Sequence, residues 1–444
     1  MNDPGYWARR PERQPGQERR SGSPHYTLNP SLRARVKAGD RSKSVPWFMA
    51  SLMLALLALT GPGGATRIGP DGKIRTICFG DIIDQTGGYN SFVIIRDDPS
   101  IETTFVPTRP DYLGGMESAL RNMRVYMPRT YDALVDSFDM ILSSDADRSV
   151  FTATWIGWIT DSVRDDGLGI LWLGSIAHDS FVSWEDTTVT EILPCRQVVT
   201  SLGEFWIHNR FLKVKISRPE EPLMKALPWE KSPPLGNLNL QSPKPGSEVW
   251  ARVDERDHPL ISFRSVEDGA ALNFASKFPG GVSRWASDWD FFPQAMMYLV
   301  YRVAEKELPD DPYLFRSAIT GFLEFNEYNS LLLSLISWVE QFGGSSAALS
   351  EGMEELQVAR MDAYAHYLEG DMQSTIDALQ EARGEQISIR EEAMRAKDRA
   401  MLWIYVIEWL VLMATLMVSG FAVWTLMVRR RLYREVGASR LSRR

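Results

Sequence analysis

A stretch of twenty residues without a charged side chain, residues 409–428, constrains this chain more than any other feature. It reads WLVLMATLMVSGFAVWTLMV, and three arginines follow it directly at 429–431. An α-helix needs about 20 apolar residues to cross the hydrocarbon core of a bilayer. We therefore expect one transmembrane helix over 401–428, in contact with the lipid bilayer through 409–428. Because Lys and Arg concentrate on the cytoplasmic side of membranes, residues 429–444 are predicted to form a cytoplasmic basic tail, with the main domain outside.

A second apolar segment, residues 46–65, lies near the start of the chain. Its apolar core has about 15 residues, which is short for a spanning helix of about 20. Basic residues precede it and small residues end it, a pattern typical of a secretory signal peptide. An uncleaved signal anchor is the alternative. Both interpretations place the residues that follow outside the cytoplasm.

Charge is unevenly distributed along the 444 residues. Residues 1–45 carry a net charge of +6, and so do residues 429–444, although the whole chain has a net charge of −8. The part between these tails therefore holds about −20, which argues against nucleic-acid binding because that requires a basic face. The first tail is rich in Arg, Pro, Gly and Ser and has no apolar periodicity, so we expect it to be disordered.

Residues 66–307 alternate between strand-like and helix-like patterns. Strand-like apolar runs occupy 74–79, 91–98, 102–107, 123–128, 138–145 and 170–174. Residues 150–164 place large apolar side chains on one helical face, and 290–306 favour a helix that closes the domain. Strands that alternate with helices predict βαβ units and a mainly parallel sheet. The expected fold class of this domain is therefore α/β.

Residues 308–400 are predicted to form an α-helical stalk between this domain and the membrane. Apolar spacing predicts four helices, at 314–325, 328–342, 347–368 and 371–400. The first two are separated at Asn326 and Glu327, and the last two form a helical hairpin. The last helix is able to continue into the membrane-spanning segment. Its mixed charges are typical of a solvated surface, and we expect a protein partner to bind the stalk.

Cysteine and histidine usage limits the chemistry that this chain can perform. Its two cysteines, Cys78 and Cys195, could form a disulfide outside the cell, but buried free thiols are the favoured interpretation. The five histidines include no pair at metal-binding helical spacing and form no cluster with cysteine. Glycine motifs that bind phosphates or dinucleotides do not occur in the domain. We therefore predict neither a metal nor a cofactor.

Three consecutive segments carry a resemblance to a known family. They read YDALVDSFDMILSSDAD, DSVRDDGLGILWLG and SFVSWEDTTVTEILPCR. In order and spacing they resemble the class I glutamine amidotransferase-like superfamily, in its branch of unknown function. The resemblance extends over residues 74–306, without the stalk or the membrane anchor. It implies a flavodoxin-like three-layer sandwich with a mainly parallel sheet.

A working enzyme of that superfamily has a nucleophilic cysteine at a Gly-x-Cys-x-Gly corner, activated by a histidine and a glutamate. The corresponding corner here is Gly174-Ser175-Ile176-Ala177-His178, and no histidine occurs between 270 and 306. We therefore predict a non-catalytic domain that acts in binding or assembly at the cell surface. A hydrolase with a noncanonical nucleophile, Ser175 or Cys195, is one alternative, with His178 as the base for Ser175. An accessory subunit of a membrane transport or secretion complex is the other.

Several residues are candidates for ligand binding because they fall near the expected carboxyl edge of the sheet, where open α/β folds bind ligands. Asp145 and Asp147 follow one predicted strand, although capping of the next helix is the alternative role for both. A glycine-bearing loop over 279–292 brings two tryptophans toward the same edge, and core packing is the alternative role for such rings. The ligand-binding candidates are Asp145, Asp147, Ser175, His178, Trp285 and Asp288.

Overall fold

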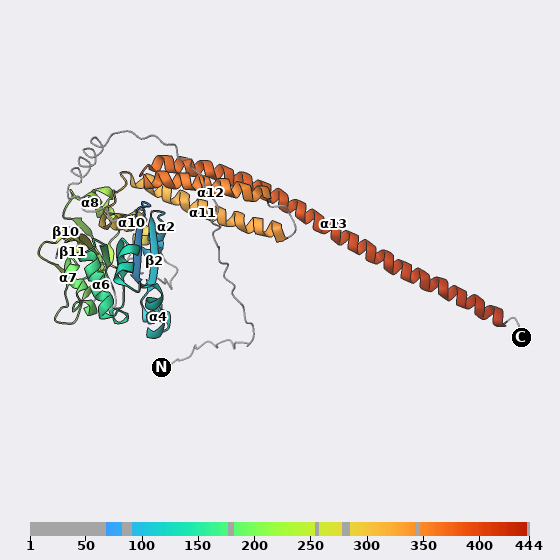
Figure 1. Ribbon diagram of the computed structural model, residues 1–444, viewed down its shortest axis with the longest axis horizontal. Helices are drawn as coiled ribbons and strands as arrows, with labels where there is room; N and C mark the ends of the chain where they lie inside the picture. The colour runs from blue at the N-terminus through green and yellow to red at the C-terminus, as the bar shows by residue number, and fades with distance from the viewer. Residues whose placement is uncertain are drawn as a thin grey trace, which may run out of the picture. The chain divides into compact units, whose positions relative to one another are not determined.

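The computed structural model describes residues 68–81, 91–175, 182–253, 257–277, 285–341 and 347–441 (Figure 1). The predictions for the basic tail at 1–45 and for the signal segment at 46–65 lie outside the described residues. His178 and residues 279–284 of the loop at 279–292 also lie outside them. The described part begins immediately before the first strand, so it contains the α/β domain, the stalk and the apolar segment near the C-terminus.

One eight-stranded sheet organises the α/β domain. In spatial order its strands are β2 (Ile101–Pro107), β1 (Ile74–Gly80), β3 (Met140–Ser144), β4 (Gly169–Leu173), β12 (Gly269–Phe274), β11 (His258–Val266), β10 (Glu248–Val253) and β7 (Val214–Ile216). The first five are mutually parallel, and the last three extend the sheet in antiparallel fashion. The prediction of an α/β fold with a mainly parallel sheet is confirmed.

Helices pack on both faces of this sheet, because successive side chains of a strand point to opposite sides. Ile74 and Cys78 of β1 belong to a core that contains the helices α2 (Ser91–Asp97) and α10 (Phe292–Val303). Ile77 and Phe79 of the same strand belong to a second core. That core includes α4 (Met116–Tyr126), α5 (Tyr131–Ser137), α6 (Ala153–Arg164) and α7 (Val189–Ile192).

The remaining elements of the domain are short. The helices are α3 (Pro110–Leu113), α8 (Pro222–Ala226) and α9 (Trp285–Asp288), with single 3-10 turns at Arg148–Val150, Val182–Trp184 and Trp229–Lys231. Two small antiparallel sheets pair β5 (Cys195–Gln197) with β9 (Gln241–Pro243), and β6 (Trp206–Leu212) with β8 (Leu235–Asn239).

Two predicted strands in the domain are wrong, because 91–98 and 123–128 contribute to helices α2 and α4. In α2 the β-branched run suggested a strand, but Phe92 and Ile95 lie one helical turn apart and are both fully buried. In α4 the buried residues are Ala119 and Met123, four positions apart, whereas Val125 is 66% exposed. Burial on a single helical face therefore outweighs the local strand propensity of both segments.

The stalk is a bundle of three helices, α11 (Pro312–Gln341), α12 (Ala347–Leu368) and α13 (Met372–Leu441). Both α11 and α12 pack against α13, which extends beyond them in Figure 1. The predicted interruption at Asn326 and Glu327 is wrong, because the buried face of α11 continues through it from Phe325 to Leu332.

The predicted break of the hairpin at 369–371 is confirmed. Gly370 takes a left-handed conformation, with φ of 83°, directly after the end of α12. Asp371 then accepts a hydrogen bond from the Ser374 amide at 3.0 Å and so caps the start of α13. These two residues turn the chain back in a short distance, and the two helices pack antiparallel.

A buried carboxylate joins the stalk to the α/β domain. Asp98, which follows α2, is fully buried, and its Oδ2 accepts a hydrogen bond from Tyr301 Oη of α10 at 2.6 Å. Its Oδ1 accepts from Tyr367 Oη of α12 at 3.0 Å and from the Ser100 hydroxyl at 2.9 Å. Both tyrosines are at most 1% exposed. The stalk is therefore attached through a dry polar network as well as through apolar contacts.

The last helix, α13, has 70 residues and spans about 105 Å at 1.5 Å per residue. It contains an 18-residue window with a mean hydropathy of 2.1, none of which is buried against the rest of the protein. The apolar side chains of 409–428 are accordingly exposed. This helix is long and apolar enough to cross a membrane, in agreement with the single-pass anchor predicted from the sequence.

Candidate functional site

Four charged side chains converge at the carboxyl edge of the parallel strands. Asp81 directly follows β1 and Asp145 directly follows β3, while Arg109 and Lys277 come shortly after β2 and β12. Lys277 Nζ contacts the carboxylate of Asp145 and lies 3.1 Å from Asp81 Oδ2. Arg109 Nη1 lies 3.7 Å from Asp145 Oδ1. The parallel register thus brings two carboxylates and two cations to one place.

This cluster is shielded from water. The side chain of Asp145 is 0% exposed, that of Lys277 is 8% and that of Asp81 is 13%. Burial raises the pKa of Asp81, although the neighbouring Lys277 opposes the shift. Burial by itself would lower the pKa of Lys277, but the charges of Asp145 and Asp81 outweigh it, and that pKa is raised. Lys277 therefore stays protonated at neutral pH and cannot act as a base.

The backbone at this edge requires particular residues. Gly80 has φ of 136°, and a Cβ atom at this position would lie 1.6 Å from the carbonyl oxygen of Ser144. Glycine therefore permits the end of β1 to approach β3 closely, where the Asp81 amide donates to the Ser144 carbonyl at 3.0 Å. The backbone of Asp145 takes the left-handed conformation, with φ of 57°, which aspartate tolerates better than most residues.

Ser175 lies at the end of β4 beside this cluster. Asn239 of β8 holds its backbone on both sides: Asn239 Oδ1 accepts from the Ser175 amide at 2.8 Å, and Asn239 Nδ2 donates to the Ser175 carbonyl at 2.7 Å. The preceding Gly174 is required here, because a Cβ atom would lie 2.4 Å from Asn239 Oδ1. The Ser175 hydroxyl donates to Asp145 Oδ1, and the residue is only 2% exposed.

This arrangement does not activate a nucleophile among the described residues. The hydroxyl of Ser175 donates to the carboxylate of Asp145, which is already paired with Arg109 and Lys277. Lys277 is protonated, so it cannot accept the proton of this hydroxyl. Cys195 lies in the small sheet formed by β5 and β9, where burial raises the pKa of its thiol to about 11. A thiol of this kind is inert as a nucleophile at neutral pH. His178, the predicted base, lies outside the described residues.

The cysteines are as expected, since Cys78 and Cys195 are both buried free thiols. No group of three His, Cys, Asp or Glu side chains that could hold a metal ion occurs within the described ranges.

The other predicted ligand-binding residues lie apart from the cluster. Asp147 Oδ1 accepts from the Ser149 amide at 2.9 Å and caps a 3-10 turn, the alternative role given to it above. Trp285 is fully buried, with its ring centroid 4.6 Å from that of Trp289, so it belongs to the core and not to a binding surface. Asp288 is exposed at the end of α9.

The structure therefore brings together two of the predicted residues, Asp145 and Ser175, and adds Asp81, Arg109 and Lys277. Asp81 was recognisable as a polar residue after a strand. Arg109 and Lys277 follow strands as well, but neither stands in a motif. Only the strand order places them beside Asp145.

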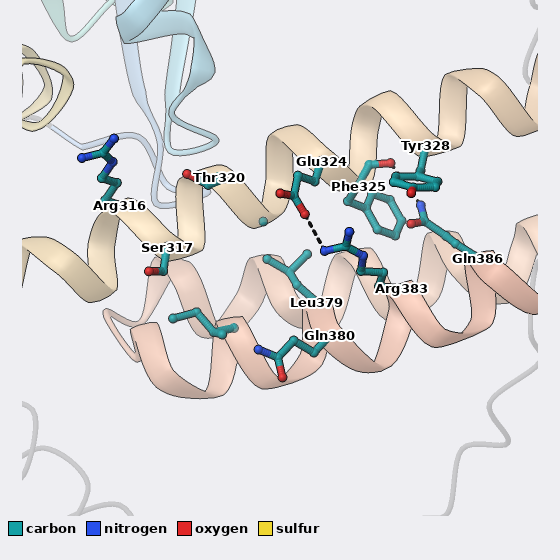
Figure 2. Close-up of a pocket in the computed structure, with 12 residues that line it drawn as sticks. Arg316, Ser317, Thr320, Glu324, Phe325, Tyr328, Leu379, Gln380, Arg383 and Gln386 are labelled. Atoms are coloured by element: carbon teal, nitrogen blue, oxygen red, sulfur yellow. Dashed lines mark hydrogen bonds and ion pairs between the residues drawn. The ribbon is translucent and has the colours of Figure 1, made fainter. Parts of the chain in front are cut away.

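A second concave feature lies in the stalk, between α11 and α13 (Figure 2). This groove has a volume of about 310 Å³. Two polar contacts cross it: Arg383 Nη1 lies 2.6 Å from Glu324 Oε2, and Gln386 Nε2 donates to the Phe325 carbonyl at 3.0 Å. These contacts join the two helices, so we do not place the functional site here.

Comparisons with known proteins are sparse. No protein-family model matches the sequence, and no curated protein does. The solved structures that it resembles include a cytoplasmic protein from Salmonella typhimurium LT2, at 18% identity and a TM-score of 0.41, covering 52% of this chain and 99% of the other. A second cytoplasmic protein from Salmonella typhimurium has 17% identity and a TM-score of 0.39, with 52% and 98% covered.

An exo-β-1,4-mannosidase from Opitutaceae bacterium strain TAV5 also resembles part of the chain, at 9% identity and a TM-score of 0.30. The match covers 52% of this chain and 36% of the mannosidase. At these TM-scores the likeness establishes neither a shared fold nor a shared activity.

Proposed function

We propose that this protein is a membrane-anchored binding protein whose α/β domain is flavodoxin-like, of the glutamine amidotransferase-like kind, and non-catalytic. The strand order β2-β1-β3-β4-β12 supports the fold, because it is the flavodoxin-like order 2-1-3-4-5 when only the parallel strands are numbered. Helices on both faces of the sheet support it as well. The inert environments of Ser175 and Cys195 support a binding role.

The observation that carries the proposal is the convergence of Asp81, Asp145, Arg109 and Lys277 at the carboxyl edge. In a doubly wound sheet the ligand crevice opens where the strand order reverses, here between β1 and β3. Asp81 and Asp145 follow these two strands. Both signs of charge meet at this edge of the sheet, where Lys277 and Arg109 pair with the aspartates, and from this we infer a small zwitterion, such as a free amino acid, as the ligand class.

The full chain in detergent should gain thermal stability from one or more free amino acids, glutamine included. The Arg109→Gln variant should lose at least about tenfold in affinity for the same compound, because a charged hydrogen bond is worth about 1.5–3 kcal/mol. Thermal-shift titration measures both proteins. Arg218→Gln is the control, since Arg218 pairs with Glu248 on the domain surface. If the wild type and Arg109→Gln bind the compound with equal affinity, the ligand does not bind at the carboxyl edge, contrary to the proposal.

The anchor is proposed to place the α/β domain outside the cytoplasm. Arg429, Arg430 and Arg431 follow the apolar segment directly, and positive residues stay on the cytoplasmic side. A protease added to intact cells should therefore degrade the domain while a C-terminal epitope tag survives, and permeabilised cells should lose both. Replacing the three arginines by glutamate should reduce the fraction of correctly oriented protein. If the protease leaves the domain intact in intact cells, the domain lies on the cytoplasmic side, contrary to the proposal.

A further inference from the structure

Another cleft lies at the amino ends of the parallel strands, opposite the carboxyl edge, where the α/β domain meets the stalk. Its volume is about 400 Å³, within the range of small-molecule sites. The domain contributes residues that precede β1 and β2 or end α2, and the stalk contributes residues of α11 and α12. The lining includes Lys73, Arg96, Asp97, Leu323, Arg360 and Tyr364.

Positive charge dominates this cleft. Lys73, Arg96 and Arg360 line it, and Asp97 is the only acidic residue of the lining. In the described part of the chain, none of these three cations forms an ion pair within 4.0 Å. Lys73 Nζ instead lies 5.5 Å from the centre of the Tyr364 ring. The lining residues of the cleft carry a net charge of +2, on a body that carries about −20, and this concentration of positive charge favours a dianion. The carboxylates of Asp71, Asp98 and Glu102 also act on Tyr364, but they do not line the cleft.

An apolar cavity of about 190 Å³ adjoins this cleft. The two cavities share Asp97 and Leu323 in their linings, so they lie next to one another. The second is lined mainly by apolar side chains, among them Ile94, Met297 and Ile319. A ligand that fills both therefore has a charged group at one end and an apolar group at the other.

The walls of this cleft are held in place by contacts between the domain and the stalk. Tyr364 Oη of α12 donates to the Pro99 carbonyl at 3.0 Å. Burial raises the pKa of Tyr364 to about 12, so its hydroxyl keeps the proton that makes this bond. The adjacent buried network around Asp98 secures the same junction.

We propose that this cleft binds an organic phosphate monoester, with the phosphate among Lys73, Arg96 and Arg360 and its apolar group in the adjoining cavity. A phosphate monoester is close to a dianion at neutral pH, and clusters of Arg and Lys suit its oxygens. The site goes beyond the proposed function, because it lies at the amino ends of the strands, away from Asp145 and Ser175.

Calorimetric titration of the full chain in a nonionic detergent, with phenyl phosphate as the probe, tests this site. We expect saturable binding at one molecule per chain, and tighter binding than for inorganic phosphate. Arg360→Gln should weaken it at least about tenfold, as loss of one charged hydrogen bond predicts. Arg390→Gln should leave it unchanged, since Arg390 is exposed on α13 and lines neither cavity.

Absence of saturable binding by the wild-type chain would overturn the proposal. Equal weakening by Arg360→Gln and Arg390→Gln would also overturn it, because it would show general attraction of an anion to positive charge. Inorganic phosphate that binds as tightly as phenyl phosphate would contradict the role of the apolar cavity. If Arg360→Gln does not fold, as judged by its thermal transition, Lys73→Gln takes its place with the same expected loss.

Discussion

Replacing Lys277 by methionine is expected to lower the free energy of unfolding by about 3–5 kcal/mol, the loss found when one partner of a buried ion pair is removed. Lys277 faces both Asp145, which is fully shielded, and Asp81. Among the described residues, its loss leaves these two carboxylates with Arg109 as the cation that lies within 4.0 Å of Asp145. Urea unfolding of the chain in detergent, followed by tryptophan fluorescence, measures the change.

Two further variants identify the cause of this loss. The double variant Lys277→Met/Asp145→Asn should be less destabilised than the sum of its single variants, because it removes the uncompensated carboxylate together with the cation. Lys215→Met is the control, since Lys215 and its partner Asp257 are 67% and 56% exposed, and exposed pairs contribute about 0–1 kcal/mol. If Lys277→Met and Lys215→Met lose equal stability, the charged cluster at the carboxyl edge is not shielded from water.

Replacing Asp98 by alanine is expected to lower the free energy of unfolding by about 3 kcal/mol, because it removes the acceptor of three buried side-chain hydrogen bonds, each worth about 0.5–1.5 kcal/mol. The donors concerned are the hydroxyls of Tyr301, Tyr367 and Ser100. Since this network joins the domain to α12, the backbone amides near the end of α12 should also exchange faster with solvent. Hydrogen exchange read by mass spectrometry measures this local effect.

The tyrosines provide the matched comparison for this junction. Tyr301→Phe should lose about 1–3 kcal/mol, whereas Tyr313→Phe should be close to neutral, because Tyr313 is 64% exposed. Unchanged exchange in α12 of the Asp98→Ala protein would show that the apolar contacts alone hold the stalk, contrary to the role given to the network.

The α/β class and the mainly parallel sheet could be predicted from the sequence, because buried parallel strands such as β3 and β4 are largely apolar and end in polar or small residues. The segments that became α2 and α4 could not, since their β-branched residues favour a strand locally and only burial against the sheet selects the helix. The continuity of α11 was missed for a similar reason. Its packing against α13 runs past the polar residues Asn326 and Glu327.

The candidate site could be predicted only in part. Asp145 and Ser175 were found because each comes at the end of an apolar run, where a ligand is expected in this class of fold. Lys277 was missed because it lies 196 residues from Asp81, its partner, and only the order of the strands brings the two together. Trp285 was a ligand-binding candidate but is fully buried in the core. The sequence does not distinguish an exposed aromatic residue in a glycine-bearing loop from one that packs into the core.

We propose that the carboxyl edge binds a ligand without performing amidotransferase chemistry. Ammonia release from glutamine by the full chain in detergent distinguishes binding from catalysis, with Ser175→Ala and Cys195→Ala measured alongside. We expect no glutamine-dependent ammonia above the buffer rate from any of the three proteins, under conditions where the wild type is folded. Glutamine-dependent release by the wild type that either substitution abolishes would contradict it and would establish a noncanonical nucleophile.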